Sequence, residues 1–286
     1  MRIALLGTGL MGSALAERLL DLGCDLTVWN RTREKVLPLA ERGARVADSP
    51  GQAIAGSEVA LSLLRDAAAT RSVLEEAGFA ALAGRTFVQM ATIGPSESLA
   101  LADDVEAAGG EYLEAPVLGS TPHARQGKLM VLLGGTEDQL ERWRELFEKI
   151  GEPTLIGPIG HGAAIKLALN QMIPNLIAAF ALSLGMVRRL GVDREVFLGI
   201  LRNSALYAPT YDGKLPKMLA RDFTEPTFPA ELMLKDVDLV RAECERLGLD
   251  ATVAGAVREI LRRTVASGHA GDDYSALYEI IDPAAS

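Results

Sequence analysis

The chain has 286 residues, a formal net charge of −9, 49% hydrophobic residues and 23% charged residues. This composition excludes disorder as the main state, and the acidic balance excludes an extended basic surface for DNA or RNA. The two cysteines are far apart and the three histidines are scattered, so we expect neither a disulfide framework nor a metal site. The apolar run Ile3 to Leu6 is too short for the core of a signal peptide, which predicts a cytoplasmic protein.

The first half of the chain alternates between strand and helix patterns. Helices are clearest at residues 10–22, which Gly23 should close, and at 137–150, where the pattern is amphipathic. Strands are predicted at residues 3–6, 26–29, 59–64, 86–90, 111–116, 129–133 and 154–156. Strands that alternate with helices predict a parallel sheet with helices on both faces.

Beyond residues 157–160 the pattern indicates helices only, at about 163–187, 194–202, 214–221, 230–247 and 253–266. We therefore predict an α/β domain over residues 1–160 and an all-α domain over residues 161–286. The first of these helices is apolar on nearly every side, which is typical of a helix buried between domains or subunits. It also carries Lys166 and Asn170, which would be costly in a bilayer, so we expect no membrane partner.

The segment Gly7-Thr8-Gly9-Leu10-Met11-Gly12 fits the pattern G-x-G-x-x-G. It follows the first predicted strand and opens the first predicted helix, which is the context that makes the pattern specific for a dinucleotide. The three glycines permit a tight turn, close approach of the backbone to a pyrophosphate, and close packing of helix on strand. Free N–H groups at the start of the helix favour the anion. We therefore expect a Rossmann domain that binds a pyrophosphate at residues 7–12.

The end of the second predicted strand, Asn30-Arg31-Thr32, indicates which dinucleotide binds. NAD-binding folds usually place Asp or Glu here, for the ribose 2′-hydroxyl. This chain has Arg31 instead, with two more cations close by, and a guanidinium forms bidentate, charge-assisted hydrogen bonds with a phosphate. We therefore predict NADP(H) as the cofactor, with Arg31 as a solvated residue at a helix start as the alternative.

Four further segments follow one another in the order typical of a single family. They are Glu114-Ala115-Pro116-Val117-Leu118-Gly119-Ser120, residues 162–170, Lys235-Asp236 and residues 273–278. Together with residues 7–12 they resemble the β-hydroxyacid dehydrogenases, the 3-hydroxyisobutyrate dehydrogenase superfamily, and most nearly its glyoxylate/succinic semialdehyde reductase branch. The resemblance implies a Rossmann domain followed by an all-α domain built on a long buried helix, and a homodimer or homotetramer. It also implies reversible reduction of a small carboxylate-bearing aldehyde to a hydroxyacid.

The same resemblance implies roles for individual residues. Lys166 would be catalytic and Asn170 would bind substrate, while Gly119, Ser120 and Thr121 would hold the substrate's carboxylate. Residues 7–12 and 30–32 would bind the cofactor, together with Leu64, Thr92 and Lys235.

The chemistry of Lys166 is plausible without the resemblance. Lys166 and Asn170 are four residues apart and so share one face of a helix. A buried ammonium is costly unless it is paired, so its presence on an apolar helix calls for a reason. Hydride attack on a carbonyl creates an alkoxide, which an ammonium can stabilise and protonate. The alternative is that the side chain of Lys166 simply extends to solvent.

Three residues depart from the family's pattern. Leu118 stands where many relatives have Ser, Ala91 stands where Ser or Thr is common, and Glu114 replaces the commoner Asp. Two hydroxyls near the expected active site are therefore missing, which leaves the identity of the aldehyde open. The alternatives are a 3-hydroxyisobutyrate dehydrogenase that uses NAD or NADP, an imine reductase, and a non-catalytic dinucleotide-binding regulator. Lys166 argues against the last two, because both tend to lack a lysine there.

Overall fold

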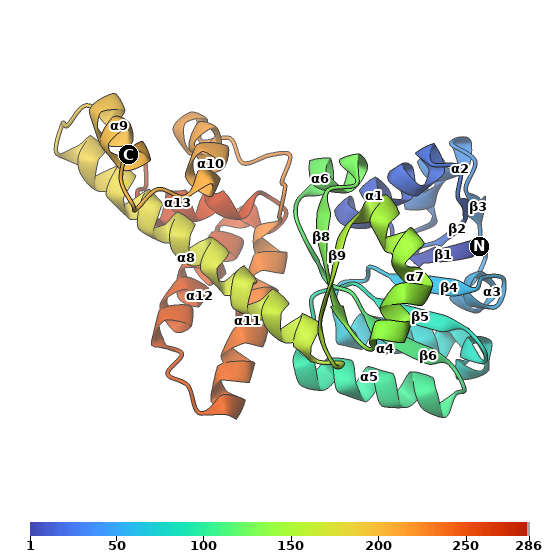
Figure 1. Cartoon of the computed structure of the whole chain (residues 1–286). Coiled ribbons are helices and arrows are strands. Elements are labelled where there is room, and N and C mark those ends of the chain that lie inside the picture. Colours follow the sequence, from blue (N-terminus) through green and yellow to red (C-terminus); the bar gives the residue numbers. More distant parts are fainter. Residues whose placement is uncertain (285–286) are drawn as a thin grey trace. The chain divides into compact units, whose positions relative to one another are not determined.

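The computed structural model describes residues 1–284 of the chain, which forms two compact units, Met1–Leu167 and Ala168–Ser286 (Figure 1). The division falls inside the long helix α8 (His161–Arg189), several residues after the expected boundary at residue 160.

Six parallel strands form the larger part of the sheet in the first unit. Their order is β3-β2-β1-β4-β5-β6, with bounds Arg45–Val46, Asp25–Trp29, Arg2–Leu6, Val59–Ser62, Thr86–Gln89 and Glu111–Glu114. The helices that connect them are α1 (Leu10–Asp21), α2 (Leu37–Glu41), α3 (Pro50–Ala55), α4 (Ala67–Ala77) and α5 (Pro95–Ala107). The strand order reverses at β1, which is the doubly wound arrangement of a Rossmann fold. The predicted α/β class is confirmed.

The remaining strands, β7 (Val117–Leu118), β8 (Leu129–Gly134) and β9 (Gly151–Gly157), form an edge that differs from the prediction. Strand β8 runs antiparallel to β6 and β7, so the expectation of a wholly parallel sheet is wrong here. The link from β7 to β8 contains only the short helix α6 (Thr121–Gln126), and a parallel pair needs a longer crossover. Helix α7 (Glu137–Ile150) supplies such a crossover, and β9 is parallel to β8.

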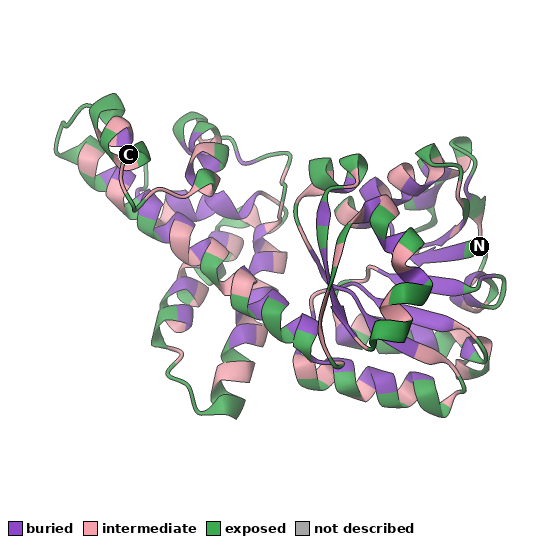
Figure 2. Cartoon of the chain, in the orientation of Figure 1, coloured by how far each residue is buried: buried purple, intermediate pink, exposed green. Residues whose placement is uncertain are grey.

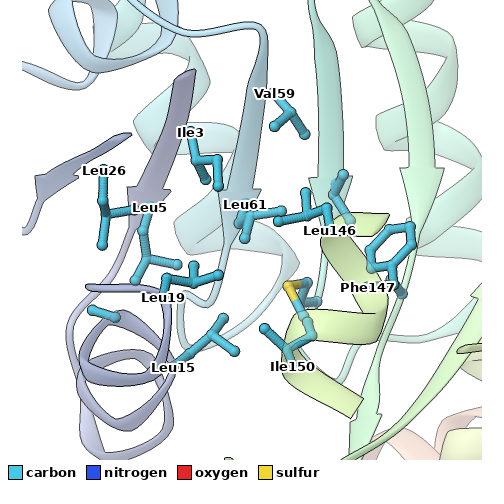
Figure 3. Close-up of a cluster of buried hydrophobic side chains, with 14 of the residues drawn as sticks. Ile3, Leu5, Leu15, Leu19, Leu26, Val59, Leu61, Leu146, Phe147 and Ile150 are labelled. Carbon is cyan, nitrogen blue, oxygen red and sulfur yellow. The ribbon is translucent and has the colours of Figure 1, made fainter. Parts of the chain in front are cut away.

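The core on one face of this sheet lies beneath α1 and α7. Leu15 and Leu19 of α1, and Leu146 and Phe147 of α7, point toward the leucines and valines of the central strands (Figure 3). The Arg18 side chain joins the two helices again, because its Nε donates to the Lys149 carbonyl oxygen at 3.0 Å. A second buried cluster, which includes Phe87 and Tyr112, covers the other face. The sheet is therefore covered on both sides, as predicted.

Helices make up the second unit. After α8 come α9 (Arg194–Arg202), α10 (Pro209–Ala220), α11 (Ala230–Leu247), α12 (Thr252–Thr264) and α13 (Leu277–Ile281). Helices α9 and α11 have the predicted bounds, whereas α10 begins five residues earlier than expected. It starts at Pro209, and proline is favoured in the first turn, where its missing N–H costs nothing.

Helix α8 is long and apolar enough, by length and composition alone, to cross a membrane. The core helix of a soluble protein passes the same test, and 39% of the most apolar window of α8 is buried. Buried and exposed residues alternate along it (Figure 2). Near its end, Arg188 and Arg189 both pair with the carboxylate of Asp282, at 2.7 and 2.8 Å. The C-terminal end of α8 is therefore held by ion pairs.

Candidate active site

The glycine loop between β1 and α1 has the shape that a dinucleotide requires. Gly7 has φ +97°, and a Cβ there would lie 2.5 Å from the Leu63 carbonyl oxygen. A Cβ on Gly12 would lie only 2.0 Å from the Gly7 carbonyl oxygen, so α1 starts directly against the loop. A Cβ on Gly9 would meet nothing within 4 Å, so the backbone is open on that side. These residues fit a pyrophosphate at the start of α1.

Asn30 holds this loop against the end of β2. The Thr8 N–H donates to Asn30 Oδ1 at 3.1 Å, and the Gly7 N–H donates to the Trp29 carbonyl oxygen at 2.9 Å. The Asn30 amide in turn donates to the Thr32 carbonyl oxygen at 2.9 Å. Asn30 therefore shapes the loop through its own side chain, a role that the motif alone did not indicate.

Of the positively charged side chains that follow β2, that of Arg31 is the best placed to bind a ligand. It is exposed, and no side chain within residues 1–284 pairs with it. Arg33, by contrast, is already paired with Asp48, at 2.8 Å between Nη1 and Oδ1. Gly7, Arg31, Leu64 and Thr92 all follow the carboxyl ends of parallel strands, which meet at one edge of the sheet. Open α/β sheets bind ligands at this edge, where the strand order reverses.

The start of α8 is bound to the same edge by Glu114, the last residue of β6. Glu114 Oε1 accepts hydrogen bonds from the Gly162 N–H at 2.7 Å and the Ala163 N–H at 3.3 Å. Lys166 follows one turn later and is 8% exposed. The first unit therefore contains the glycine loop, Arg31 and a buried lysine on a helix that begins at the ligand-binding edge.

Ser120 has a contact that the sequence did not predict. Its backbone N–H lies 3.2 Å, and its Oγ 2.7 Å, from Nδ1 of His123 on α6. Gly119 precedes it with φ +143°, where a Cβ would be 2.8 Å from a methyl carbon of Leu129. Thr121 begins α6. Both the backbone N–H and the hydroxyl of Ser120, a residue that the resemblance implies as a ligand of the substrate's carboxylate, thus contact an imidazole.

In the second unit, Asn170 is paired with an acid. Its Nδ2 donates to Asp236 Oδ2 at 2.7 Å, and both side chains are buried. Asn170 Oδ1 is also buried and has no hydrogen-bond partner among residues 1–284, while Asp236 Oδ1 lies 2.8 Å from Lys235 Nζ. Asp236 was not among the predicted site residues. Its only signal was its position beside Lys235, whose role toward the cofactor stays a prediction.

Within residues 1–284, no group of three or more His, Cys, Asp or Glu side chains is arranged to hold a metal ion.

Two family models together match nearly the whole chain. The NAD binding domain of 6-phosphogluconate dehydrogenase matches residues 2–160, and the NAD-binding domain of NADP-dependent 3-hydroxyisobutyrate dehydrogenase matches residues 160–281.

Individual proteins that are similar to this chain indicate the same family. Glyoxylate/succinic semialdehyde reductase 2, chloroplastic, from Arabidopsis thaliana is 31% identical over 99% of this chain and 80% of its own length. Glyoxylate/succinic semialdehyde reductase 1 from the same plant is 30% identical over 98% of both chains. The structure of Mycobacterium tuberculosis 3-hydroxyisobutyrate dehydrogenase has the same fold, with a TM-score of 0.88 and 24% identity over 98% of this chain and 99% of that one.

The fold, the glycine loop and the matched families define an oxidoreductase that uses a nicotinamide dinucleotide. The chain belongs to the β-hydroxyacid dehydrogenase superfamily, the superfamily of 3-hydroxyisobutyrate dehydrogenase. The expected resemblance is confirmed. The roles of individual residues are not tested by these comparisons and stay predictions.

Proposed function

We propose that the protein is an NADPH-dependent reductase of small carboxylate-bearing aldehydes, such as succinic semialdehyde or glyoxylate, and that it works reversibly as a hydroxyacid dehydrogenase. The observation that carries this proposal is the buried Lys166, one turn after the point where Glu114 binds α8 to the ligand-binding edge of the sheet. The two plant relatives support the substrate class, because both are named for glyoxylate and succinic semialdehyde.

In this proposal, different residues of the first unit bind the cofactor and transfer the proton. The start of α1 holds the pyrophosphate, and Arg31 binds the 2′-phosphate. Bound NADPH supplies the hydride. The Lys166 ammonium stabilises the alkoxide that forms on the aldehyde oxygen and donates its proton to it. In the reverse direction, the neutral amine takes the proton from the alcohol.

In this proposal Ser120, in the first unit, anchors the substrate's carboxylate. Ser120 has a backbone N–H and a hydroxyl to offer once the substrate displaces His123 Nδ1. Asn170 of the second unit, which the family resemblance implies as a substrate-binding residue, donates one amide hydrogen to Asp236 and has a second to donate. A site that is built on polar groups discriminates strongly against a substrate that leaves them unpaired. Succinic semialdehyde should therefore be reduced far better than butyraldehyde.

The decisive test is Lys166→Ala, with NADPH oxidation followed by absorbance. General acid catalysis contributes about 10²–10⁴-fold, so kcat should fall at least about a hundred-fold. NADPH affinity should stay near that of the wild type. Lys166→Arg should restore activity only in part, because a guanidinium keeps the charge but is a poor proton donor. A Lys166→Ala variant that retains a tenth of wild-type kcat, with chemistry rate-limiting, would refute the assignment.

A panel of aldehydes, assayed with NADPH and NADH side by side, separates the alternatives. Preference for methylmalonate semialdehyde with NADH would indicate a 3-hydroxyisobutyrate dehydrogenase instead. Reduction of cyclic imines but not of aldehydes would indicate an imine reductase. Tight NADPH binding without turnover of any compound would indicate a non-catalytic regulator. Equal kcat/KM for succinic semialdehyde and butyraldehyde would refute the carboxylate anchor.

A further inference from the structure

We propose that Glu114 is a positioning residue for the reaction: its buried carboxylate fixes the first turn of α8 and so sets the place of Lys166. This inference rests on the proposed role of Lys166. It gives a function to a residue that departs from the family's usual Asp.

The Glu114 carboxylate accepts hydrogen bonds from the backbone of α8 and from a side chain of α5. Oε1 accepts the Gly162 and Ala163 N–H groups at the start of α8, and Oε2 accepts the Ser98 hydroxyl at 2.5 Å. The Ser98 oxygen lies 2.8 Å from the hydroxyl of Tyr112, which can donate to it. The two backbone N–H groups can only donate, so Oε1 must serve them as an acceptor, and this contact ties the end of β6 to the start of α8.

The Glu114 side chain is 1% exposed. Burial therefore raises the pKa of Glu114, and the hydrogen bonds from Ser98, Ala163 and Gly162 act against that rise. The first N–H groups of α8 donate to Oε1, and the helix dipole at this end favours an anion. Glu114 and the start of α8 thus stabilise each other.

The surrounding backbone makes room for this contact. A Cβ at position 134 would lie 2.0 Å from Glu114 Oε1, and a Cβ at position 162 would lie 2.6 Å from the Leu132 carbonyl oxygen. Glycines at these two positions let the helix start approach the end of β6 and the neighbouring β8. The Glu114 side chain spans the distance from the end of β6 to the first N–H groups of α8.

The contact of Glu114 with the first turn of α8 affects the position of Lys166 through the helix backbone. Gly162 and Lys166 are four residues apart and lie on the same face of α8. If the first turn loses its carboxylate partner, the backbone that carries Lys166 is free to shift. A misplacement of about 1 Å can cost about a hundred-fold in rate, so this site should be sensitive to the loss.

The test compares Glu114→Ala, Glu114→Gln and Glu114→Asp with the wild type in kcat, KM, NADPH affinity and thermal unfolding. We expect Glu114→Ala to lower kcat about 10- to 100-fold and to leave NADPH affinity within about three-fold. Glu114→Gln keeps an oxygen for the two N–H groups and should retain kcat within about five-fold. Glu114→Asp, whose carboxylate is one methylene shorter, should fall in between. Glu111→Gln is the matched control, because Glu111 lies at the other end of β6 and pairs with Arg142.

The variants are then repeated in the Lys166→Ala background. If Glu114 acts through Lys166, Glu114→Ala or Glu114→Asp should lower kcat less than about two-fold further there. An equal loss in both backgrounds would overturn the inference, as would a Glu114→Gln variant as inactive as Glu114→Ala. If Glu114→Ala does not fold, a Glu114→Asp variant with wild-type kcat would overturn it equally. Wild-type activity of Lys166→Ala alone would instead count against the proposed function.

Discussion

The glycines of the chain differ in whether the structure leaves room for a side chain. This difference matters most in the glycine loop between β1 and α1. A Cβ on Gly12 would collide with the backbone of Gly7, whereas a Cβ on Gly255, within α12, would meet nothing within 4 Å. The same change of residue should therefore have opposite effects at the two positions.

We expect Gly12→Ala to weaken NADPH binding at least about ten-fold and to lower the free energy of unfolding by about 1–3 kcal/mol, because backbone must move to admit the methyl group. Gly255→Ala should raise the free energy of unfolding by about 0.5–1 kcal/mol, since alanine is the better helix former, and should leave NADPH binding unchanged. Fluorescence titration and urea unfolding measure both quantities. Normal NADPH binding by Gly12→Ala would show that the loop tolerates a displaced α1.

Arg31 and Arg33 provide a second contrast between neighbouring residues. Hydrogen bonds to charged groups contribute about 1.5–3 kcal/mol each, so Arg31→Ala should weaken NADPH binding about ten- to a hundred-fold and leave NADH affinity almost unchanged. Arg33→Ala should have a much smaller effect, because Arg33 already pairs with Asp48. Dissociation constants for both cofactors and both variants test this. A wild type that prefers NADH would show that the interpretation of this strand end is wrong.

The sequence could indicate the glycine loop, Arg31 and Lys166 because each belongs to a short, continuous motif. It could not indicate the contacts that orient them. Glu114 and Gly162 are 48 positions apart, and Asn170 and Asp236 are 66 positions apart. Such pairs form only when the folded chain brings separate elements together, and one sequence carries no record of that.

Helices and strands were predictable to different degrees. Helix α9 begins as predicted because Asp193 caps it, accepting the Glu195 and Val196 N–H groups, and α11 ends where Gly248 adopts φ +70°. The direction of β8 was not predictable, because an apolar run has the same pattern whichever way the strand points. The length of the preceding link decides the direction.

One buried ion pair joins two elements of the second unit. Lys214 of α10 contacts both oxygens of Asp273, at 2.8 and 2.7 Å, just before the short helix η4 (Tyr274–Ala276). Burial alone would raise the pKa of Asp273, but the Lys214 ammonium and the hydrogen bonds from Lys214 and Ser275 hold it below its usual value.

We therefore expect Asp273→Asn to lower the free energy of unfolding by about 3–5 kcal/mol at pH 7, because it leaves a buried ammonium without its partner. The pKa of Asp273 is lower in the folded state, so its stabilising effect is complete above the unfolded pKa of about 4 and is lost as the pH falls through the folded value. The wild type should thus lose more stability than Asp273→Asn on acidification below pH 4. Urea unfolding across pH measures this. The exposed pair of Glu259 with Arg262 is the control, and Glu259→Gln should change little.

The molecule as a whole exposes apolar side chains on its second unit. Leu182 and Met186 lie four residues apart on α8, and Val196 and Ile200 lie four residues apart on α9, each more than half exposed. Exposed apolar residues that lie close together, as the two of each pair do on their helix, mark interaction sites more often than single ones do. We propose that a second copy of the chain covers them in a homodimer or homotetramer.

Ile200→Glu should then shift the protein toward the monomer, because a charge on this face would be buried without a partner. Light scattering after size-exclusion chromatography measures the change. Val253→Glu is the control, since Val253 is equally exposed but lies on α12. A wild-type monomer at micromolar concentration would contradict the proposal.

The packing of α1 against α7 has a consequence for how the protein is made. Arg18 and Lys149 are 131 positions apart, and the cluster that buries the leucines of α1 is complete only when α7 is in place. A ribosome adds about 5–20 residues per second, so the leucines of α1 wait on the order of 7–26 s for their last partners. During synthesis, the first strand–helix pair is therefore the segment that a chaperone should meet.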